Sequence, residues 1–132
     1  MSWDVLLLRL PDDVTSLEEI PSGHTPAPLG RRHEVLAAVT EAVPEVDLSD
    51  PAWGELHGPT WSIELNIGSG DPVDSIMLHI RGSGDDALTP ALRIAASLRC
   101  GAIDCAEGSL LAPGRTSGWH AFQEFRDRVT GP

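Results

Sequence analysis

The stretch that decides the fold is Trp61-Ser62-Ile63-Glu64-Leu65-Asn66-Ile67, followed shortly afterwards by Ile76-Met77-Leu78-His79-Ile80-Arg81. Apolar and polar residues alternate in both runs, which is the period of a strand with one buried face. The turn residues Gly68-Ser69-Gly70-Asp71-Pro72 lie in the interval between them. The sequence therefore predicts a β-hairpin with a longer loop, apolar on one face and polar on the other.

The elements that flank this hairpin follow from periodicity and from breaker residues. They are a central strand at Ser2–Leu10, a helix at Arg31–Val43, a second helix capped by Thr89 and stopped by Gly101, a strand at Ala102–Cys105 and a last amphipathic helix at Ser117–Val129. Residues 11–30 and 45–58 are rich in Pro, Gly and Asp and are predicted to be loops. Trp53, in the second loop, is expected to cover an edge of the core.

The resulting order, β-α-β-β-α-β followed by a helix, predicts a single α+β domain over residues 1–132. The first six elements match the ferredoxin-like split β-α-β arrangement, in which a four-stranded antiparallel sheet carries two helices on one face. We expect the extra C-terminal helix to cover part of the other face. The alternative is an α+β roll with a different strand order.

The charge of the chain restricts its partners. It has 20 acidic and 9 basic side chains, a formal net charge of -11. Nucleic acid and anionic membranes are disfavoured as partners, and a basic protein would be steered toward this surface. The simpler explanation is that the acidity only maintains solubility. All the basic residues except histidine are arginine, a bias typical of bacterial genomes rich in GC. No signal or membrane-spanning segment is recognisable and there are two cysteines, so a cytoplasmic location is expected.

The polar face of the predicted sheet is the first candidate site. Glu64, His79, Arg81 and Asp104 are all expected to point away from the two packed helices. A carboxylate, an imidazole and a guanidinium on neighbouring strands could perform acid–base chemistry or bind a small ligand. The alternative is a cross-strand ladder of ion pairs without a function beyond stability.

Other motifs indicate no cofactor and no metal. The histidines are scattered, and Cys100 and Cys105 lack the spacing of a zinc site. Gly68-Ser69-Gly70-Asp71 and Gly82-Ser83-Gly84-Asp85 are alike, but turn formation explains both, and neither is followed by the Lys-Ser or Lys-Thr of a phosphate-binding loop. No catalytic grouping is recognisable, so the sequence favours a protein that is not an enzyme.

The chain resembles a group of small uncharacterised bacterial proteins, some of which resemble immunity proteins of toxin systems. The stretches that carry the likeness are Trp3-Asp4-Val5, Pro28-Leu29-Gly30, Val46-Asp47-Leu48-Ser49-Asp50-Pro51-Ala52-Trp53-Gly54, Ser62-Ile63-Glu64 and Ile76-Met77-Leu78-His79-Ile80-Arg81-Gly82. The resemblance covers most of the chain and carries no catalytic residue across.

Acidity, small size and this resemblance together favour a non-enzymatic domain that binds a basic protein, such as an immunity-type inhibitor of a toxin. The candidate contact residues are Asp47, Asp50, Trp53 and Glu55. Two alternatives remain open. One is a small-molecule binder or an enzyme that uses the polar sheet face. The other is a homo-oligomer, such as a homodimer, that pairs through sheet edges or the C-terminal helix.

Overall fold

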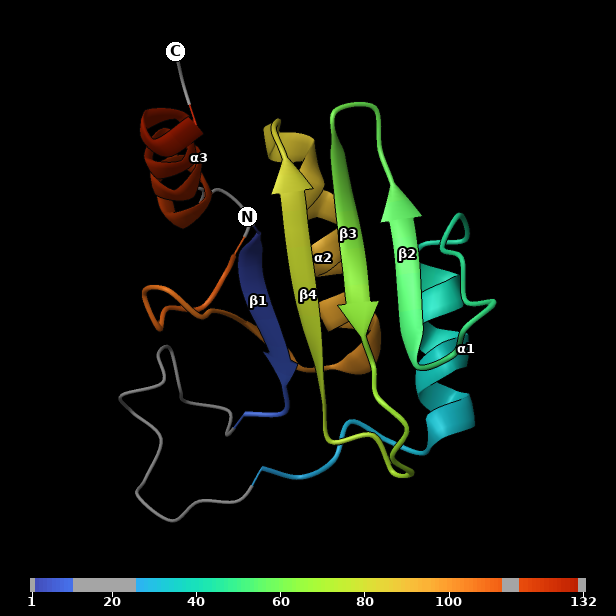
Figure 1. Cartoon of the computed structure of the whole chain (residues 1–132). Coiled ribbons are helices and arrows are strands. Elements are labelled where there is room, and N and C mark those ends of the chain that lie inside the picture. Colours follow the sequence, from blue (N-terminus) through green and yellow to red (C-terminus); the bar gives the residue numbers. More distant parts are fainter. Residues whose placement is uncertain (1, 11–25, 113–116, 131–132) are drawn as a thin grey trace.

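The computed structural model describes residues 2–10, 26–112 and 117–130, and the predicted loop at 11–30 lies mostly outside these ranges. Over these ranges the fold is α+β, with three α-helices and a single five-stranded antiparallel sheet in the order β2-β3-β4-β1-β5 (Figure 1). The strands are β1 (Trp3–Leu8), β2 (Trp53–His57), β3 (Trp61–Asn66), β4 (Ser75–Gly82) and β5 (Gly101–Asp104). The helices are α1 (Arg32–Ala42), α2 (Leu88–Leu98) and α3 (Ser117–Thr130).

The predicted hairpin is confirmed as β3 and β4. Ile63 lies opposite Ile80 and Leu65 opposite Leu78, and all four side chains are buried. Glu64 lies opposite His79 on the other face. The alternation of the sequence therefore divides the sheet into a core face and an outer face.

The prediction of four strands is wrong by one, because part of the predicted loop at 45–58 forms β2 at the sheet edge. Leu56 is the only large side chain that β2 buries, and Gly54 contributes no side chain. Trp53 is a strand residue that points outward, so it does not cover the core edge. A five-residue strand with one buried large side chain gives almost no periodic signal.

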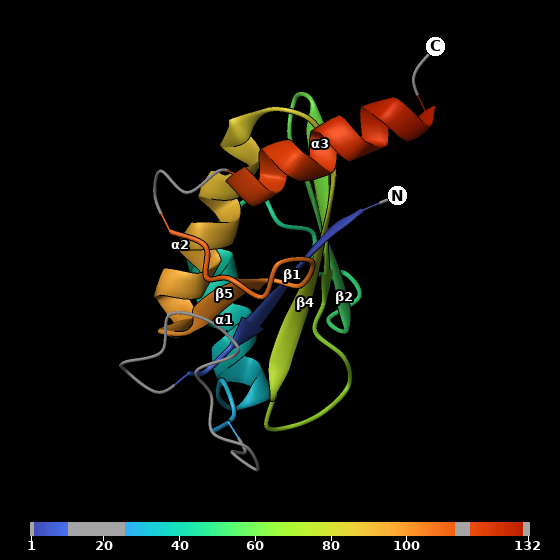
Figure 2. The ribbon, with the colours of Figure 1, turned by 90° about the vertical axis from the view of Figure 1, so that its left-hand side faces the viewer.

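Helices α1 and α2 both cover the core face (Figure 2). Val35 and Val39 of α1 and Ile94 of α2 are buried among the inward residues of the sheet. The helix α1 begins without a capping side chain of its own. Asp71, in the β3–β4 loop, instead accepts a hydrogen bond at 3.1 Å from the backbone N–H of Arg32, which satisfies one of the free donors of the first turn.

The predicted ends of α2 differ from the observed ones. A short 3-10 helix over Asp85–Ala87 runs directly into α2, so Thr89 is inside the helix and does not cap it. The helix ends at Leu98, three residues before the expected Gly101, because Arg99 takes the left-handed conformation (φ 53°) that closes the last turn.

Helix α3 packs at one corner of the sheet and leaves the outer face of β2, β3 and β4 uncovered (Figures 1 and 2). Trp119 is buried against Trp3, with ring centroids 5.4 Å apart, and its Nε1 donates to the carbonyl of Gly84 at 3.1 Å. Arg126 donates to the carbonyl of Gly82. The expectation that α3 covers part of the outer face is therefore not met over these three strands. Within the described ranges, none of the helices has the length and apolar character needed to cross a membrane.

Candidate functional site

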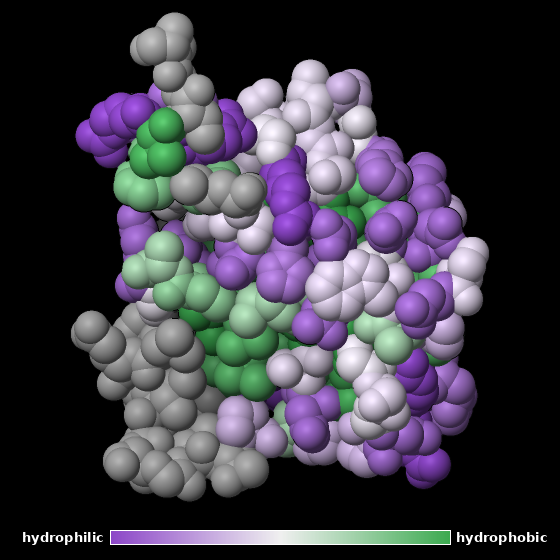
Figure 3. Space-filling view, in the orientation of Figure 1, coloured by the Kyte–Doolittle hydropathy of each residue, from purple (hydrophilic) through white to green (hydrophobic). Residues whose placement is uncertain are grey.

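The outer face brings together three of the four residues predicted for the ligand site. Glu64 accepts a hydrogen bond from the Arg81 guanidinium, and His79 lies directly opposite Glu64 on the neighbouring strand. Hydrophilic side chains spread over β4, β3 and β2 on this face, while an apolar area lies over the lower part of β1 (Figure 3). Leu6, Leu8 and Met77 are half-buried on the apolar side.

Asp104, the fourth predicted residue, lies on the opposite face of the sheet, so the prediction that it points away from the helices is wrong. In β5 it is paired with the buried Val5, and the residue itself is 2% exposed. Its carboxylate accepts a hydrogen bond from Nε1 of Trp3 at 3.2 Å. Its neighbour Ile103 is paired with Leu6 and faces the outer side. Both faces of the neighbouring strand β1 carry apolar residues, so the sequence could not decide which side of β5 faces the helices.

His79 is held between two residues that the ligand-site prediction did not include. Its Nδ1 lies 2.8 Å from Oδ1 of Asp4, on β1, and its ring is stacked on Trp53 with centroids 5.7 Å apart. The His79 side chain is only 22% exposed as a result. In the sequence, Asp4 stands out only as the polar residue directly before the apolar run of the first strand. It could not be placed beside His79, because the outward face of that strand could not be assigned from the sequence.

All four predicted partner-binding residues line one exposed cavity of about 240 Å³, together with Ser49. Three of them are carboxylates and the fourth is Trp53, which is 36% exposed. We call Asp47, Asp50, Trp53 and Glu55 the acidic–aromatic patch. It adjoins the outer face, because Trp53 stacks on His79 and Glu55 lies opposite Glu64.

Local hydrogen bonds fix the shape and charge of the acidic–aromatic patch. Asp47 and Glu55 exchange two backbone hydrogen bonds of 2.8 and 3.0 Å, which bind the loop to the edge of β2. The hydroxyl and the backbone N–H of Ser49 both donate to Asp47, and these bonds lower the pKa of its carboxyl group. Asp47 therefore keeps its negative charge down to acidic pH.

The thiol nearest to the outer face is not activated. Burial raises the pKa of Cys105, and the negative charges of Asp4 and Asp104 raise it further. A thiol with a raised pKa stays protonated at neutral pH and is a poor nucleophile. The pairing of Asp4 with His79 therefore does not generate a cysteine nucleophile here.

No group of three or more His, Cys, Asp or Glu side chains within the described ranges is arranged to hold a metal ion. Comparisons of the chain with protein-family models, with curated proteins and with solved structures found no match.

Proposed function

We propose that this protein is a non-enzymatic binding domain that recognises a basic protein through the acidic–aromatic patch. The observation that carries the proposal is that three carboxylates and an exposed tryptophan surround one cavity on the surface of a chain with a net charge of -11. Tryptophan is enriched among residues that dominate binding energy, and complementary charge accelerates association.

The cavity suits the side chain of an arginine or lysine from the partner. A guanidinium or ammonium group placed over Trp53 would gain a cation–π interaction of about 0.5–2 kcal/mol. The carboxylates of Asp47, Asp50 and Glu55 would neutralise its charge. Because hydrogen bonds from Ser49 lower the pKa of Asp47, this attraction would persist below neutral pH.

An immunity-type inhibitor is the specific role that we propose. A toxin that cleaves nucleic acid needs a basic surface to bind phosphate, and an acidic domain can block that surface. The order of β1, α1, β3, β4, α2 and β5 supports the further proposal that the fold is ferredoxin-like, with β2 added at an edge and α3 added at a corner.

The second candidate is a small-molecule binder that uses the outer face beside His79. The observation in its favour is the arrangement of Asp4, His79 and Trp53, an oriented imidazole stacked on an indole. Against it, Glu64 and Arg81 already neutralise each other, and His79 already has a carboxylate partner. These pairs are what a cross-strand ladder of ion pairs would also produce.

The test compares two triple variants with the same change of charge. Asp47→Asn with Asp50→Asn and Glu55→Gln neutralises the acidic–aromatic patch. The control set neutralises three exposed carboxylates elsewhere, with the substitutions Glu41→Gln, Asp74→Asn and Glu124→Gln.

Tagged protein is used to capture partners from a lysate of its own host at 50 and 500 mM NaCl. We expect a basic protein to be retained by the native chain and by the control variant at low salt. The patch variant should bind the purified partner at least tenfold more weakly. Equal affinity of the two variants, or capture of no basic protein at low salt, would refute the proposal.

A further inference from the structure

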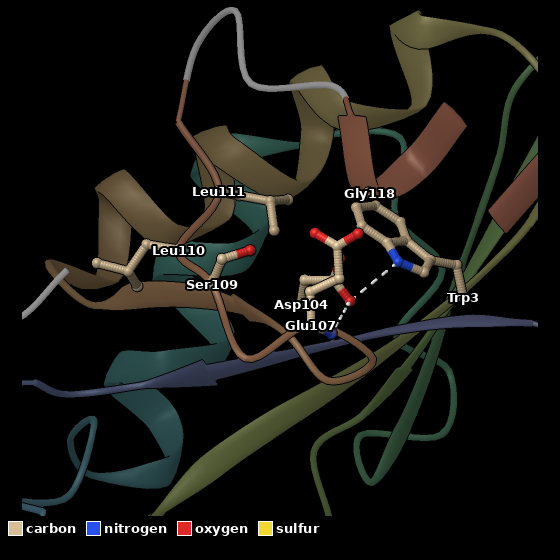
Figure 4. Close-up of a pocket in the computed structure, with 7 residues that line it drawn as sticks. All are labelled: Trp3, Asp104, Glu107, Ser109, Leu110, Leu111 and Gly118. Atoms are coloured by element: carbon tan, nitrogen blue, oxygen red, sulfur yellow. Dashed lines mark hydrogen bonds between the residues drawn. The ribbon is translucent and has the colours of Figure 1, made fainter. Parts of the chain in front are cut away.

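Two adjoining cavities lie where α3 meets β1 and the loop after β5, on the side of the molecule away from the acidic–aromatic patch. Their volumes are about 350 and 380 Å³, and they share Trp3, Glu107 and Gly118 as lining residues. Figure 4 shows the first of the two. Each is within the range of volumes that accommodate small molecules in proteins. Together they form what we call the corner cavity, which has a polar end and an apolar end.

The polar end is formed by two carboxylates, Asp104 and Glu107. Asp104 is 2% exposed, and its Oδ1 accepts hydrogen bonds from Nε1 of Trp3 and from the backbone N–H groups of Ala106 and Glu107. Oδ2 of the same group receives no hydrogen bond from any residue in the described part of the chain. Asp104 is among the residues that line this cavity, so its carboxylate can accept a hydrogen bond from a ligand bound there.

Glu107 brings a second negative charge to the same place. Oδ2 of Asp104 and Oε2 of Glu107 lie 2.2 and 3.5 Å from the position that a Cβ on Gly118 would occupy, so the two carboxylates are close neighbours. In Figure 4 both carboxylates lie next to the Trp3 indole and below Gly118. Like charges this close repel each other, and a cation placed between them would relieve that repulsion.

The apolar end is formed by α3. Ala121, Phe122 and Phe125 line it together with Trp3, and Phe125 is 50% exposed although it is a large aromatic residue. The Phe122 ring is stacked on Trp119 with centroids 5.8 Å apart, so this wall is backed by a buried side chain. An aromatic surface of this kind binds the hydrocarbon part of a ligand.

We propose that the corner cavity binds a small organic cation, a primary amine that carries an aromatic body. Its ammonium group lies against Oδ2 of Asp104 and the carboxylate of Glu107, and its ring lies against Phe122 and Phe125. An ammonium group suits the polar end because it donates up to three hydrogen bonds, and Oδ2 accepts none from the residues that the structure describes. The proposal is independent of the acidic–aromatic patch and of any protein partner.

The experiment uses the full chain and three probe compounds of similar shape. Phenethylamine carries a positive charge at neutral pH, 2-phenylethanol carries none and phenylacetate carries a negative one. Each compound is titrated to 10 mM while the NMR signal of the Trp3 indole N–H is followed, because this group donates a hydrogen bond to Asp104. We expect a saturable shift with phenethylamine, and at least tenfold weaker binding of the two other compounds.

Three variants locate the site. Glu107→Gln changes an exposed side chain and should weaken phenethylamine binding at least fivefold. Ala121→Trp fills the apolar end and should weaken it by a similar factor. Glu55→Gln makes the same change of charge in the acidic–aromatic patch and should leave amine binding unchanged, while it weakens binding of a protein partner.

Failure here can be distinguished from failure of the proposed function. Absence of saturable binding of phenethylamine at 10 mM would overturn the corner-cavity proposal. Equal binding of the amine and the alcohol would overturn the role of the carboxylates. Binding that neither Glu107→Gln nor Ala121→Trp weakens would place the amine elsewhere and would also overturn the proposal. None of these outcomes bears on capture of a basic protein.

Discussion

Replacement of Gly118 by alanine tests whether the Asp104 carboxylate determines how α3 is positioned. Gly118 is the second residue of α3, and alanine is the better helix former by about 1 kcal/mol. Helix propensity alone therefore predicts that Gly118→Ala stabilises the protein. The structure predicts the opposite, because the new Cβ would lie 2.2 Å from Oδ2 of Asp104.

The size of the effect follows from what holds Asp104 in place. Its side chain is short and buried, and Oδ1 accepts three hydrogen bonds, so the carboxylate cannot move without breaking some of them. Hydrogen bonds to a charged group contribute about 1.5–3 kcal/mol each. Loss of one or two of them, less the gain in helix propensity, gives a net destabilisation of roughly 2 kcal/mol.

The measurement is urea unfolding followed by tryptophan fluorescence and by circular dichroism. Ala121→Gly is the control, because it makes the reverse change at an exposed position of the same helix and should cost about 1 kcal/mol. If Gly118→Ala leaves stability unchanged or raises it, Asp104 does not fix the position of α3, and the reasoning about this corner of the fold fails.

Three further predictions concern the backbone and the half-buried thiol of Cys100. Arg99→Gly should stabilise the protein by about 0.5–1 kcal/mol in urea unfolding, because glycine adopts the left-handed conformation of this residue (φ 53°) without the cost that a side chain imposes. Gly82→Ala should cost roughly 2–4 kcal/mol in the same assay, because φ is 100° and a Cβ would lie 2.2 Å from the carbonyl oxygen of Thr60; a loss below about 0.5 kcal/mol would contradict this. Burial raises the pKa of Cys100 from its usual 9.0 to about 11. Its alkylation by iodoacetamide at pH 8 should be about 100-fold slower in the native protein than in urea. The contribution of Cys100 to stability should fall as the pH rises from 9 toward 11, because only the unfolded chain ionises this thiol in that interval.

The elements predicted correctly include those in which several apolar residues recur at one regular spacing. The β3–β4 hairpin and α3 are confirmed, because each has three or more apolar residues at a regular spacing. The strand β2 was missed because it buries only one large side chain. Its position depends instead on pairing with β3 and with the loop at Asp47, and such tertiary hydrogen bonds leave no periodic trace in a sequence.

The two candidate sites were predictable to different degrees for the same reason. Asp47, Asp50, Trp53 and Glu55 lie within nine consecutive positions, so their proximity followed from the chain itself. The ligand site needed the correct face of three strands. Glu64, His79 and Arg81 belong to the hairpin, where apolar and polar faces are distinct, and they do come together. Asp104 belongs to a strand beside β1, whose two faces are both apolar, and there the face could not be assigned.

The hydrogen bonds at the two edges of the sheet indicate that a partner would bind through side chains rather than by adding a strand. At the β2 edge, the backbone N–H groups of Trp53 and Glu55 already donate to Asp50 and Asp47. At the other edge, Asp104 and Ala102 of β5 are bonded to the backbone of residues 109 and 111. Sheets that add a strand from another chain need free donors and acceptors along an edge. With these groups occupied, homodimer formation through the sheet edges is disfavoured. The surface that β2 offers to a partner is then the acidic–aromatic patch and the exposed residues around it.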